Sequence, residues 1–328
     1  MKAVILCAGI GKRLRPFSYT IPKHILPVCN QPVLRYLLNE LAEASDIREI
    51  ALVVSKETIV PIREYLNEKS QELPFTFTYL FQEKPLGLAH ACSMAEEFLA
   101  GEDFMMLLGD NIIPGGIKSI LTSDGGILSG QDATILVRHV PDPKPYGVVE
   151  FDATGTVISM EEKPVEPKSN YVIVGIYTFR ESIFSSIRQI KPSYRGELEI
   201  TDAIFHLKQT GRKVMAKVFD GVFLDIGNPH SYLSANQYVM KNFAPCNSID
   251  TTTVIKDSLI NWDVSIGKEV FVEASVLSNC ILLPGSRVIA SNLKNSIIGN
   301  NCFVNLNNQN EEAVTLFLGD DSMISKDT

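Results

Sequence analysis

The stretch "AVILCAGIGKRLRP", residues 3–16, decides what kind of fold to expect. An apolar run from Ala3 to Leu6 opens into a segment that carries two glycines, two arginines and a lysine. Charged side chains are almost never buried unpaired, so a core element gains nothing from such a segment. Glycine lets the backbone approach a ligand, and cationic side chains attract an anion. The stretch therefore predicts a buried strand followed by an anion-binding loop.

The alternation of strand and helix patterns continues along the first third of the chain. Strand-like apolar runs occupy residues 3–7, 49–54, 75–81 and 104–108. Helical spacing of apolar residues occupies the segments between them, at 32–45, 57–69 and 87–99. This order predicts βαβ units in an α/β fold, with a doubly wound, mostly parallel sheet. Ligands bind outside the carboxyl ends of such strands, where the loop 9–31 and the "GDN" of 109–111 both fall.

The pattern changes twice after residue 130. From about 132 to 226 short strands broken by Pro and Gly alternate with helical segments, which predicts an α+β region closed by a helix near 228–242. Beyond Pro245 a seven-residue pattern recurs every 16 residues, as "IGKEVFV", "LLPGSRV" and "IGNNCFV". Such repeats predict a short solenoid of parallel strands, with an ordinary β-rich tail as the alternative. We therefore expect two domains, 1–243 and 244–328.

Composition narrows the class of protein. The 328 residues are 45% hydrophobic and 21% charged, so the chain can bury a sizeable core. A net charge of −8 argues against a general nucleic-acid partner, although a local cationic pocket for a small anion remains compatible with it. The six cysteines form no CxxC pair, which is typical of a reduced, cytoplasmic protein. We expect no signal peptide and no membrane partner, because no apolar stretch approaches the ~20 residues of a membrane span.

Two common phosphate-binding motifs can be excluded for the first loop. A P-loop needs Ser or Thr after Gly11-Lys12, where this chain has Arg13, and it needs a glycine five residues before Gly11. A dinucleotide-binding fingerprint needs a third glycine where Leu14 stands. What remains is a glycine turn followed by cationic side chains.

Longer motifs carry a resemblance to a known family. "LCAGIGKRLRP" together with "PKHILPV" resembles the signature of the sugar-nucleotide pyrophosphorylases, the nucleotidyltransferases that join an NTP to a sugar 1-phosphate. The resemblance continues over nearly all of residues 1–240, through "FQEKPLGLAHA", "LLGDN", "PYGVVEFD", "EEKP", "SNYVIVGIY", "RGELEITD" and "VFLDIG". The chain departs from the family pattern at Ala8 and Lys12. Several motifs look most like those of the glucose-1-phosphate thymidylyltransferases, and the tail resembles the left-handed β-helix of longer relatives.

The resemblance implies a reaction and a set of site residues. A sugar-phosphate oxygen attacks the α-phosphorus of dTTP in line, giving dTDP-glucose and pyrophosphate on a Rossmann-like domain. The residues implied for catalysis are Arg13, Lys23 and Lys163. Those implied for nucleotide binding are Leu6, Ala8, Gly9, Gly11, Gln82, Pro85 and Gly87. Those implied for sugar binding are Gly147, Glu162, Lys163 and Gly175, and Asp110 and Asp225 are the implied ligands of Mg²⁺.

These residue types suit that chemistry. All reacting groups are anionic, so positioning and charge neutralisation supply most of the rate. Arg13 presents a fork to the β- and γ-phosphates, and Lys23 presents a point charge to the α-phosphate. Carboxylates are the oxygen ligands that Mg²⁺ accepts beside phosphate. The amide of Gln82 can both donate to and accept from the imide edge of thymine or uracil.

Other interpretations remain open at this point. A UTP-dependent enzyme acting on glucose 1-phosphate or N-acetylglucosamine 1-phosphate is the nearest, followed by a non-catalytic sugar-nucleotide sensor and a glycosyltransferase. Asp110 could instead cap a helix, Asp225 could make a turn, and Gln82 could be an ordinary solvated side chain. His24 and His90 are expected in the core or on the surface. We expect the tail to mediate homo-oligomer formation, and not acyl transfer, because no histidine follows His230.

Overall fold

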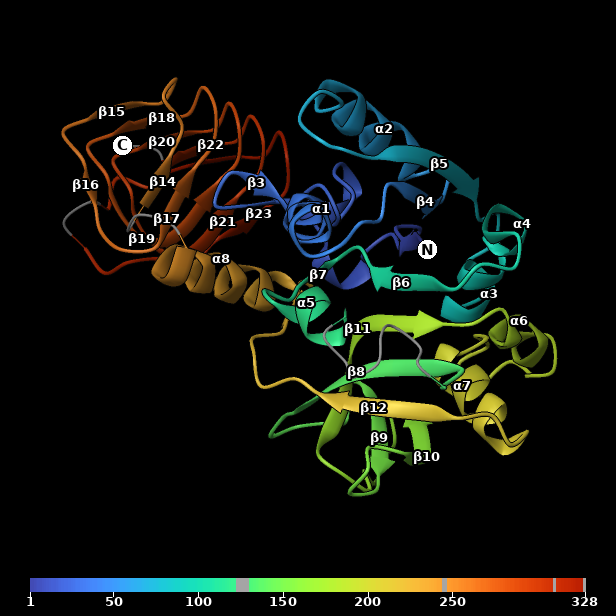
Figure 1. Ribbon diagram of the computed structural model, residues 1–328. Helices are drawn as coiled ribbons and strands as arrows, with labels where there is room; N and C mark the ends of the chain where they lie inside the picture. The colour runs from blue at the N-terminus through green and yellow to red at the C-terminus, as the bar shows by residue number, and fades with distance from the viewer. Residues whose placement is uncertain (122–129, 244–246, 309–310, 327–328) are drawn as a thin grey trace. The chain divides into compact units, whose positions relative to one another are not determined.

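The computed structural model describes residues 1–121, 130–243, 247–308 and 311–326 (Figure 1). The chain forms two compact units. The sheet unit contains Met1–Gly9 and Tyr36–Phe223, and the β-helix unit contains Ile10–Arg35 and Leu224–Thr328. The first loop therefore groups with the C-terminal repeats. The expected domain boundary falls at residue 244, outside the described residues, and the division into domains stays a prediction.

The sheet unit is built on the parallel strands expected from the first third of the chain. They are β1 (Lys2–Leu6), β4 (Glu49–Val54), β5 (Thr76–Phe81) and β6 (Phe104–Leu108). They lie in the order β6-β1-β4-β5, with Leu6 opposite both Val53 and Leu108. The central strands β1 and β6 are buried along almost their whole length, as parallel strands covered on both faces must be. The prediction of an α/β sheet is confirmed.

Antiparallel strands extend this sheet in the region expected to be α+β. They are β8 (Ala133–His139), β9 (Gly147–Phe151), β10 (Val157–Glu162) and β11 (Tyr171–Phe179), and β12 (Val214–Val218) pairs with β8 in parallel. The long strand β11 joins the two halves, because it pairs antiparallel with β6, β8 and β9. Its register shifts between Ile173 and Tyr177, which places a bulge around Gly175.

Helices cover the sheet where helical spacing was expected, with two differences. The helices are α1 (Val33–Ala44), α2 (Ile59–Glu68), α3 (Leu88–Ser93), α4 (Glu96–Leu99), α5 (Gly116–Leu121), α6 (Ser182–Ile187) and α7 (Ile200–Gln209). Helix α5 was not predicted. The segment 87–99, predicted as one helix, contains two short helices instead. Its apolar spacing runs on through Met94 and Ala95, and no glycine or proline marks the interruption. Ala95 and Leu99 nevertheless stay in the core, so burial is conserved across the break.

The C-terminal repeats form a parallel β-helix, as the 16-residue period predicted. One sheet contains β15 (Val254–Lys256), β18 (Phe271–Glu273), β20 (Arg287–Ile289), β22 (Phe303–Asn305) and β24 (Met323–Ser325). The other contains β14 (Asn247–Ile249), β16 (Leu259–Ile260), β17 (Val264–Ile266), β19 (Val276–Leu282), β21 (Asn292–Ile298) and β23 (Phe317–Leu318). Val264, Val272, Leu282, Val288 and Val304 are among the buried residues of its core.

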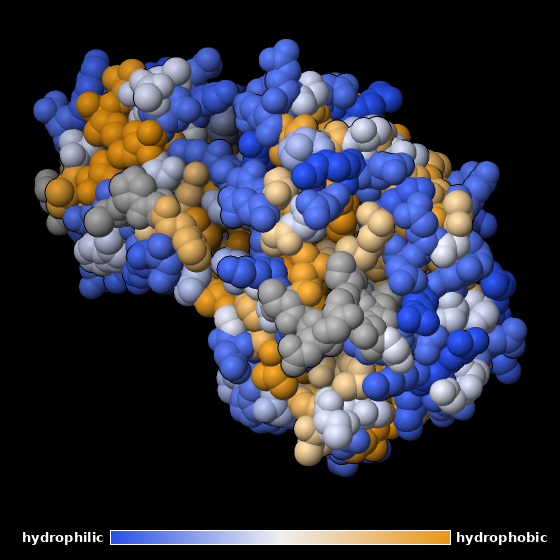
Figure 2. All heavy atoms as spheres, in the orientation of Figure 1, coloured by the Kyte–Doolittle hydropathy of each residue, from blue (hydrophilic) through white to orange (hydrophobic). Residues whose placement is uncertain are grey.

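Left-handed backbone at regular intervals turns each coil of the β-helix. Residues with positive φ recur at equivalent positions of successive coils and form three columns. The first column is Glu269, Gly285, Asn301 and Asp321, and the second is Asp257, Ala274, Ala290 and Asn307. The third is Asp263, Asn279 and Asn295. Side chains also stack at one corner, where Nδ2 of Asn279 donates to Oδ1 of Asn295 over 2.8 Å. The outer surface over β15 and β16 carries hydrophobic side chains (Figure 2), and Val254, Leu259 and the single tryptophan Trp262 are exposed.

The remaining elements of the β-helix unit lie in the first loop and next to the repeats. The short helices η1 (Lys12–Leu14) and η2 (Phe17–Tyr19) are followed by a hairpin of β2 (Pro27–Val28) and β3 (Gln31–Pro32). Helix α8 (Pro229–Phe243) begins with reciprocal capping, in which Ser231 N–H donates to Asn228 Oδ1 and Asn228 N–H donates to Ser231 Oγ. Within the described ranges, no helix is both long and apolar enough to cross a bilayer.

Candidate active site

The carboxyl ends of β1 and β6 lie side by side, as the strand order requires. Gly109 N–H donates to the carbonyl of Leu6 over 3.1 Å, and Cys7 N–H donates to Val53 over 2.7 Å. Leu6 and Ala8 are buried, whereas Gly9 is exposed. Asp110 follows β6 at this edge and is succeeded by the short strand β7 (Asn111–Ile112), not by a helix, so the helix-cap interpretation is wrong.

The glycine turn of the first loop lies in the β-helix unit. Gly11 has φ 63, in the left-handed region that side chains with a Cβ rarely adopt. Its carbonyl accepts from Ser18 Oγ over 2.6 Å and from Leu14 N–H over 2.8 Å. A Cβ at Gly11 would lie 3.5 Å from both Cβ and Cδ of Lys23. The turn therefore brings the backbone of Gly11 against the side chain of Lys23.

Arg13 lies beside one of the two predicted metal ligands. A Cβ at Gly227 would be 3.1 Å from Oδ2 of Asp225 and 3.2 Å from Nη2 of Arg13. Asp225 ends the short strand β13 (Leu224–Asp225), and Arg13 is exposed in η1. Residues separated by more than 200 positions in the sequence thus place a carboxylate and a guanidinium next to the same glycine.

The expected base-recognition segment is tightly packed in the sheet unit. Gln82 is only 5% exposed, so it is not an ordinary solvated glutamine. Its Nε2 lies 2.8 Å from Nδ1 of His90 and 3.4 Å from the carbonyl of Gly87. Gly87 has φ 108, and a Cβ there would lie 2.5 Å from the carbonyl oxygen of Leu198. Only glycine fits this position, while Pro85 beside it is exposed.

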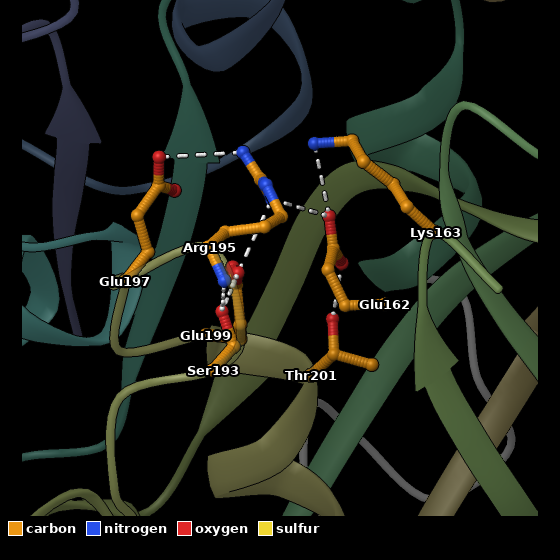
Figure 3. Close-up of polar contacts among 7 residues, drawn as sticks. All are labelled: Glu162, Lys163, Ser193, Arg195, Glu197, Glu199 and Thr201. Atoms are coloured by element: carbon orange, nitrogen blue, oxygen red, sulfur yellow. Dashed lines mark hydrogen bonds and ion pairs between the residues drawn. The ribbon is translucent and has the colours of Figure 1, made fainter.

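A cluster of charged side chains surrounds Glu162 at the end of β10 (Figure 3). Its Oε1 lies 3.2 Å from Nζ of Lys163 and 3.6 Å from Nη1 of Arg195. Its Oε2 accepts a hydrogen bond of 2.7 Å from Thr201 Oγ1, at the start of α7. Gly147 lies opposite Glu162 in the β9–β10 register, and a Cβ there would be 3.1 Å from Oε2. Three of the four residues implied for sugar binding are therefore neighbours.

Arg195 links this carboxylate to two others. Its guanidinium lies 3.1 Å from Glu199 Oε1 and 3.3 Å from Glu197 Oε1. Burial raises the pKa of Glu199, the charge of Glu162 adds to the rise, and Ser193 and Arg195 oppose it. Burial likewise raises the pKa of Asp202, with a further contribution from Glu162.

The fourth residue implied for sugar binding, Gly175, lies at the bulge of β11. A Cβ at Gly175 would be 2.4 Å from Nδ2 of Asn111, which is itself buried. Nearby, burial raises the pKa of Tyr177, and the negative charges of Glu162 and Asp110 raise it further. Asp110, expected to bind metal, and Glu162, expected to bind sugar, therefore both raise the pKa of the buried Tyr177.

Comparison with known proteins places this geometry in a family. The family described as "Nucleotidyl transferase" matches residues 2–242. The chain belongs to the nucleotidyl transferase family. A glucose-1-phosphate thymidylyltransferase of Streptomyces antibioticus is 34% identical over 358 residues and covers 99% of both chains. The UTP–glucose-1-phosphate uridylyltransferase AglF of Haloferax volcanii is 36% identical, over 72% of this chain and 96% of its own.

A solved structure resembles this nucleotidyltransferase as well. The structure of a UDP-glucose pyrophosphorylase complexed with UDP-glucose matches with a TM-score of 0.65 and 25% identity, over 73% of this chain and 98% of that one. The relatives share one class of reaction, and the chain is a sugar-1-phosphate nucleotidyltransferase.

The structure places further residues of this nucleotidyltransferase next to the predicted site residues. His90 was expected in the core or on the surface, and it contacts the amide of Gln82. Arg195 and Thr201 lie within the motif "RGELEITD", yet only the structure places both against Glu162. The spacing of Arg195 and Glu199 gave no signal of this arrangement, because opposite charges four residues apart are neighbours on a helix and these residues precede α7.

The donor chemistry of Asp110 and Asp225 fits a magnesium ion. Both side chains are carboxylates that retain partial exposure, and each lies at the end of a strand. Mg²⁺ is usually held by one or two carboxylates together with phosphate oxygens, and it needs no larger cage. Among the described residues, no cluster of three or more acidic, histidine or cysteine side chains could hold a metal ion.

Proposed function

We propose that this enzyme joins dTTP and glucose 1-phosphate to give dTDP-glucose and pyrophosphate. The observation that carries the proposal is the similarity to a glucose-1-phosphate thymidylyltransferase over 99% of both chains, a span that includes the β-helix. The "GLAHA" and "RGELEITD" motifs support the same assignment. They meet in the structure, where Ala89 N–H donates to the carbonyl of Leu198 over 3.0 Å.

The chemistry needs no covalent intermediate on the protein. An ionised phosphate oxygen of the sugar phosphate attacks the α-phosphorus, a new P–O bond forms, and the bond from the α-phosphorus to the bridging oxygen breaks. Pyrophosphate leaves with the electron pair of that bond. Arg13 neutralises the β- and γ-phosphates, Lys23 the α-phosphate, and Lys163 the phosphate of the sugar. Mg²⁺, when bound by Asp110 and Asp225, would add positive charge to the phosphates.

The remaining roles concern recognition. Gln82 hydrogen-bonds the imide edge of the base, and its contact with His90 limits the orientations that its amide can adopt. Glu162 accepts hydrogen bonds from sugar hydroxyls, next to the backbone of Gly147 and Gly175. Leu6, Ala8, Gly9, Gly11, Pro85 and Gly87 shape the nucleotide site through their backbone.

A UTP-dependent activity is the second candidate, favoured by the similarity to AglF and by the imide edge that uracil shares with thymine. A panel of four NTPs and several sugar 1-phosphates, read by pyrophosphate release, decides between the two. We expect the highest kcat/KM for dTTP with glucose 1-phosphate. A higher value for UTP would assign the second activity, and no release from any pair would refute both.

We also propose that the β-helix joins copies of this chain. Parallel coils leave strand edges and faces that a partner can cover. Leu259 and Trp262 of the β-helix are 57% and 55% exposed, so their apolar side chains are available for a second copy to cover. Replacing Trp262 by Glu would then lower the mass measured by light scattering, and an unchanged mass would argue against this surface.

A further inference from the structure

The hairpin at the end of the first loop is attached to the first coils of the β-helix through Asn30. Cys29 and Asn30 have φ 48 and 61, the pair of left-handed residues that a tight two-residue hairpin needs. Nδ2 of Asn30 donates to the carbonyl of Ser248 over 3.1 Å and to that of Ile266 over 2.9 Å. Ser265 Oγ also lies 3.4 Å from Oδ1 of Asn30. One amide therefore contacts two successive coils.

Helix α8 holds the same hairpin from another side. Cys29 N–H donates to Oδ1 of Asn236 over 2.8 Å, and the hydroxyl of Tyr232 donates to the carbonyl of Pro27 over 2.6 Å. Tyr232 and Asn236 are fully buried. The end of the loop is therefore fixed by buried as well as exposed groups.

The last coil of the β-helix holds the loop at a second place. Thr20 Oγ1 donates to Oδ2 of Asp320 over 2.6 Å. Asp320 is fixed in turn, because its carboxylate accepts from both the backbone N–H and the side-chain amide of Asn300 over 2.8 Å. The backbones also approach closely, since a Cβ at Gly319 would lie 2.9 Å from Cβ of Pro16.

The two cations of the loop that are assigned to the phosphates lie close to these contacts in the sequence. Lys23 stands three residues after Thr20, and Arg13 stands three residues before Pro16. Buried Leu14, Phe17 and Leu26 leave the intervening chain little freedom to move independently. A shift of the loop at Thr20 or Pro16 would therefore shift the charges that neutralise the phosphates.

We infer that the β-helix positions the phosphate-binding loop, with Asn30 and the Thr20–Asp320 pair as positioning residues. This inference rests on the proposed function for its consequence in catalysis, but not for the attachment itself. It gives the repeats a role inside each single chain, separate from the association of copies. The last coil, far from the loop in sequence, becomes part of the machinery that sets the rate.

Hydrogen–deuterium exchange tests the attachment without any substrate. In the full-length protein the amides of Tyr19 and Ile21 are bonded to Pro16 and Phe17. Thr20→Val and Asp320→Ala should each speed exchange in residues 14–23 by about tenfold, because local opening becomes cheaper. The double variant should add little to Asp320→Ala alone, because Asp320→Ala already removes the contact with Thr20. Asn30→Asp should act similarly, since it replaces a donor by a carboxylate facing carbonyl oxygens.

The control is Asp321→Ala. Asp321 adjoins Asp320 and contacts Asn301 over 3.3 Å, a contact within the β-helix. Its loss should leave exchange in residues 14–23 at the wild-type rate. Thr20→Ser keeps the hydroxyl and should restore slow exchange. Equal exchange in Asp320→Ala, Asp321→Ala and wild type would overturn the inference.

Kinetics then test the consequence. With the proposed substrates, Thr20→Val and Asp320→Ala should lower kcat and raise KM for the NTP. We expect kcat/KM to fall about tenfold, because a misplacement of about 1 Å can lower the rate roughly a hundredfold and the loop should shift by less. The melting temperature of Thr20→Val should stay close to that of Asp321→Ala, whereas Asp320→Ala also loses its bonds to Asn300 and is assayed at a temperature where it remains folded. Faster exchange with unchanged kcat/KM would overturn the positioning role. If the wild-type protein uses no substrate pair, the proposed function fails, while the exchange rates still decide whether the loop is held.

Discussion

Glu40 offers a quantitative test of the packing in the sheet unit. Its carboxylate lies half-buried on α1, and its Oε1 accepts from Ile117 N–H at the start of α5 over 2.8 Å. Burial raises the pKa of Glu40 to about 7, backbone donors from α5 oppose the rise, and the charge of Glu43 adds to it. Glutamine has the same shape and keeps an acceptor oxygen for Ile117, but it carries no charge. Glu40→Gln therefore removes the titration and leaves the hydrogen bond.

The sign and size of the effect follow from the two pKa values. In the unfolded chain the carboxyl titrates at 4.5, and in the folded chain at about 7. Between these values the folded state binds more protons, so this group's contribution to stability is present below pH 4.5 and is lost as the pH rises through 7. The difference corresponds to at most roughly 3 kcal/mol. Glu40→Gln should therefore match the wild type at pH 4 and exceed it by up to that amount at pH 8.

Urea denaturation from pH 4 to pH 9 measures this difference directly. The matched control is Glu43→Gln, one turn along the same helix and exposed, which should keep most of the pH dependence of the wild type. If the unfolding free energies of Glu40→Gln and wild type run parallel across this range, Glu40 is ionised throughout and the argument from burial is wrong.

Three further variants test the site. Gly87→Ala should lower the free energy of unfolding by about 2–3 kcal/mol because of its contact with Leu198, whereas Gly211→Ala, also at positive φ but with no described atom within 4 Å, should cost about 1 kcal/mol. Asp225→Ala should abolish turnover at an unchanged melting temperature; normal turnover would remove this residue from the metal site. Arg195→Met should raise the pKa of Glu199, followed by NMR titration of its carboxyl group, and an unchanged pKa would count against this pairing.

Local patterns in the sequence predict those strands, helices and repeats that depend on the spacing of neighbouring apolar residues. The strand at Lys2–Leu6 and the strand at Phe104–Leu108 are continuous apolar runs, and the rule for parallel sheets brings their carboxyl ends together. The 16-residue period predicts the repeats, because each coil must place the same residue types at the same corner. The break between α3 and α4 could not be found this way, since no residue there disfavours a helix.

Contacts between distant residues could not be predicted from patterns. Thr20 and Asp320 are separated by 300 positions, and nothing in either neighbourhood specifies the other. The same holds for Arg13 and Asp225, which meet at Gly227. The family motifs named Glu162 and Lys163, but the three-dimensional path of the chain was needed to add Arg195 and Thr201 to them.

The first loop contacts both the first coils and the last coil of the repeats. The number of coils between these contacts must therefore match the length of the loop. From Ile266 the register runs through Leu282 and Ile298 to Leu318, three steps of about 4.8 Å each. The segment from Thr20 to Asn30 spans this stack, because its ends contact Asp320 and Ile266. One additional coil would carry Asp320 about 5 Å beyond the reach of Thr20. Substitutions on the outer face of the repeats leave this distance unchanged, whereas a change in the number of coils would require a segment of different length between Thr20 and Asn30.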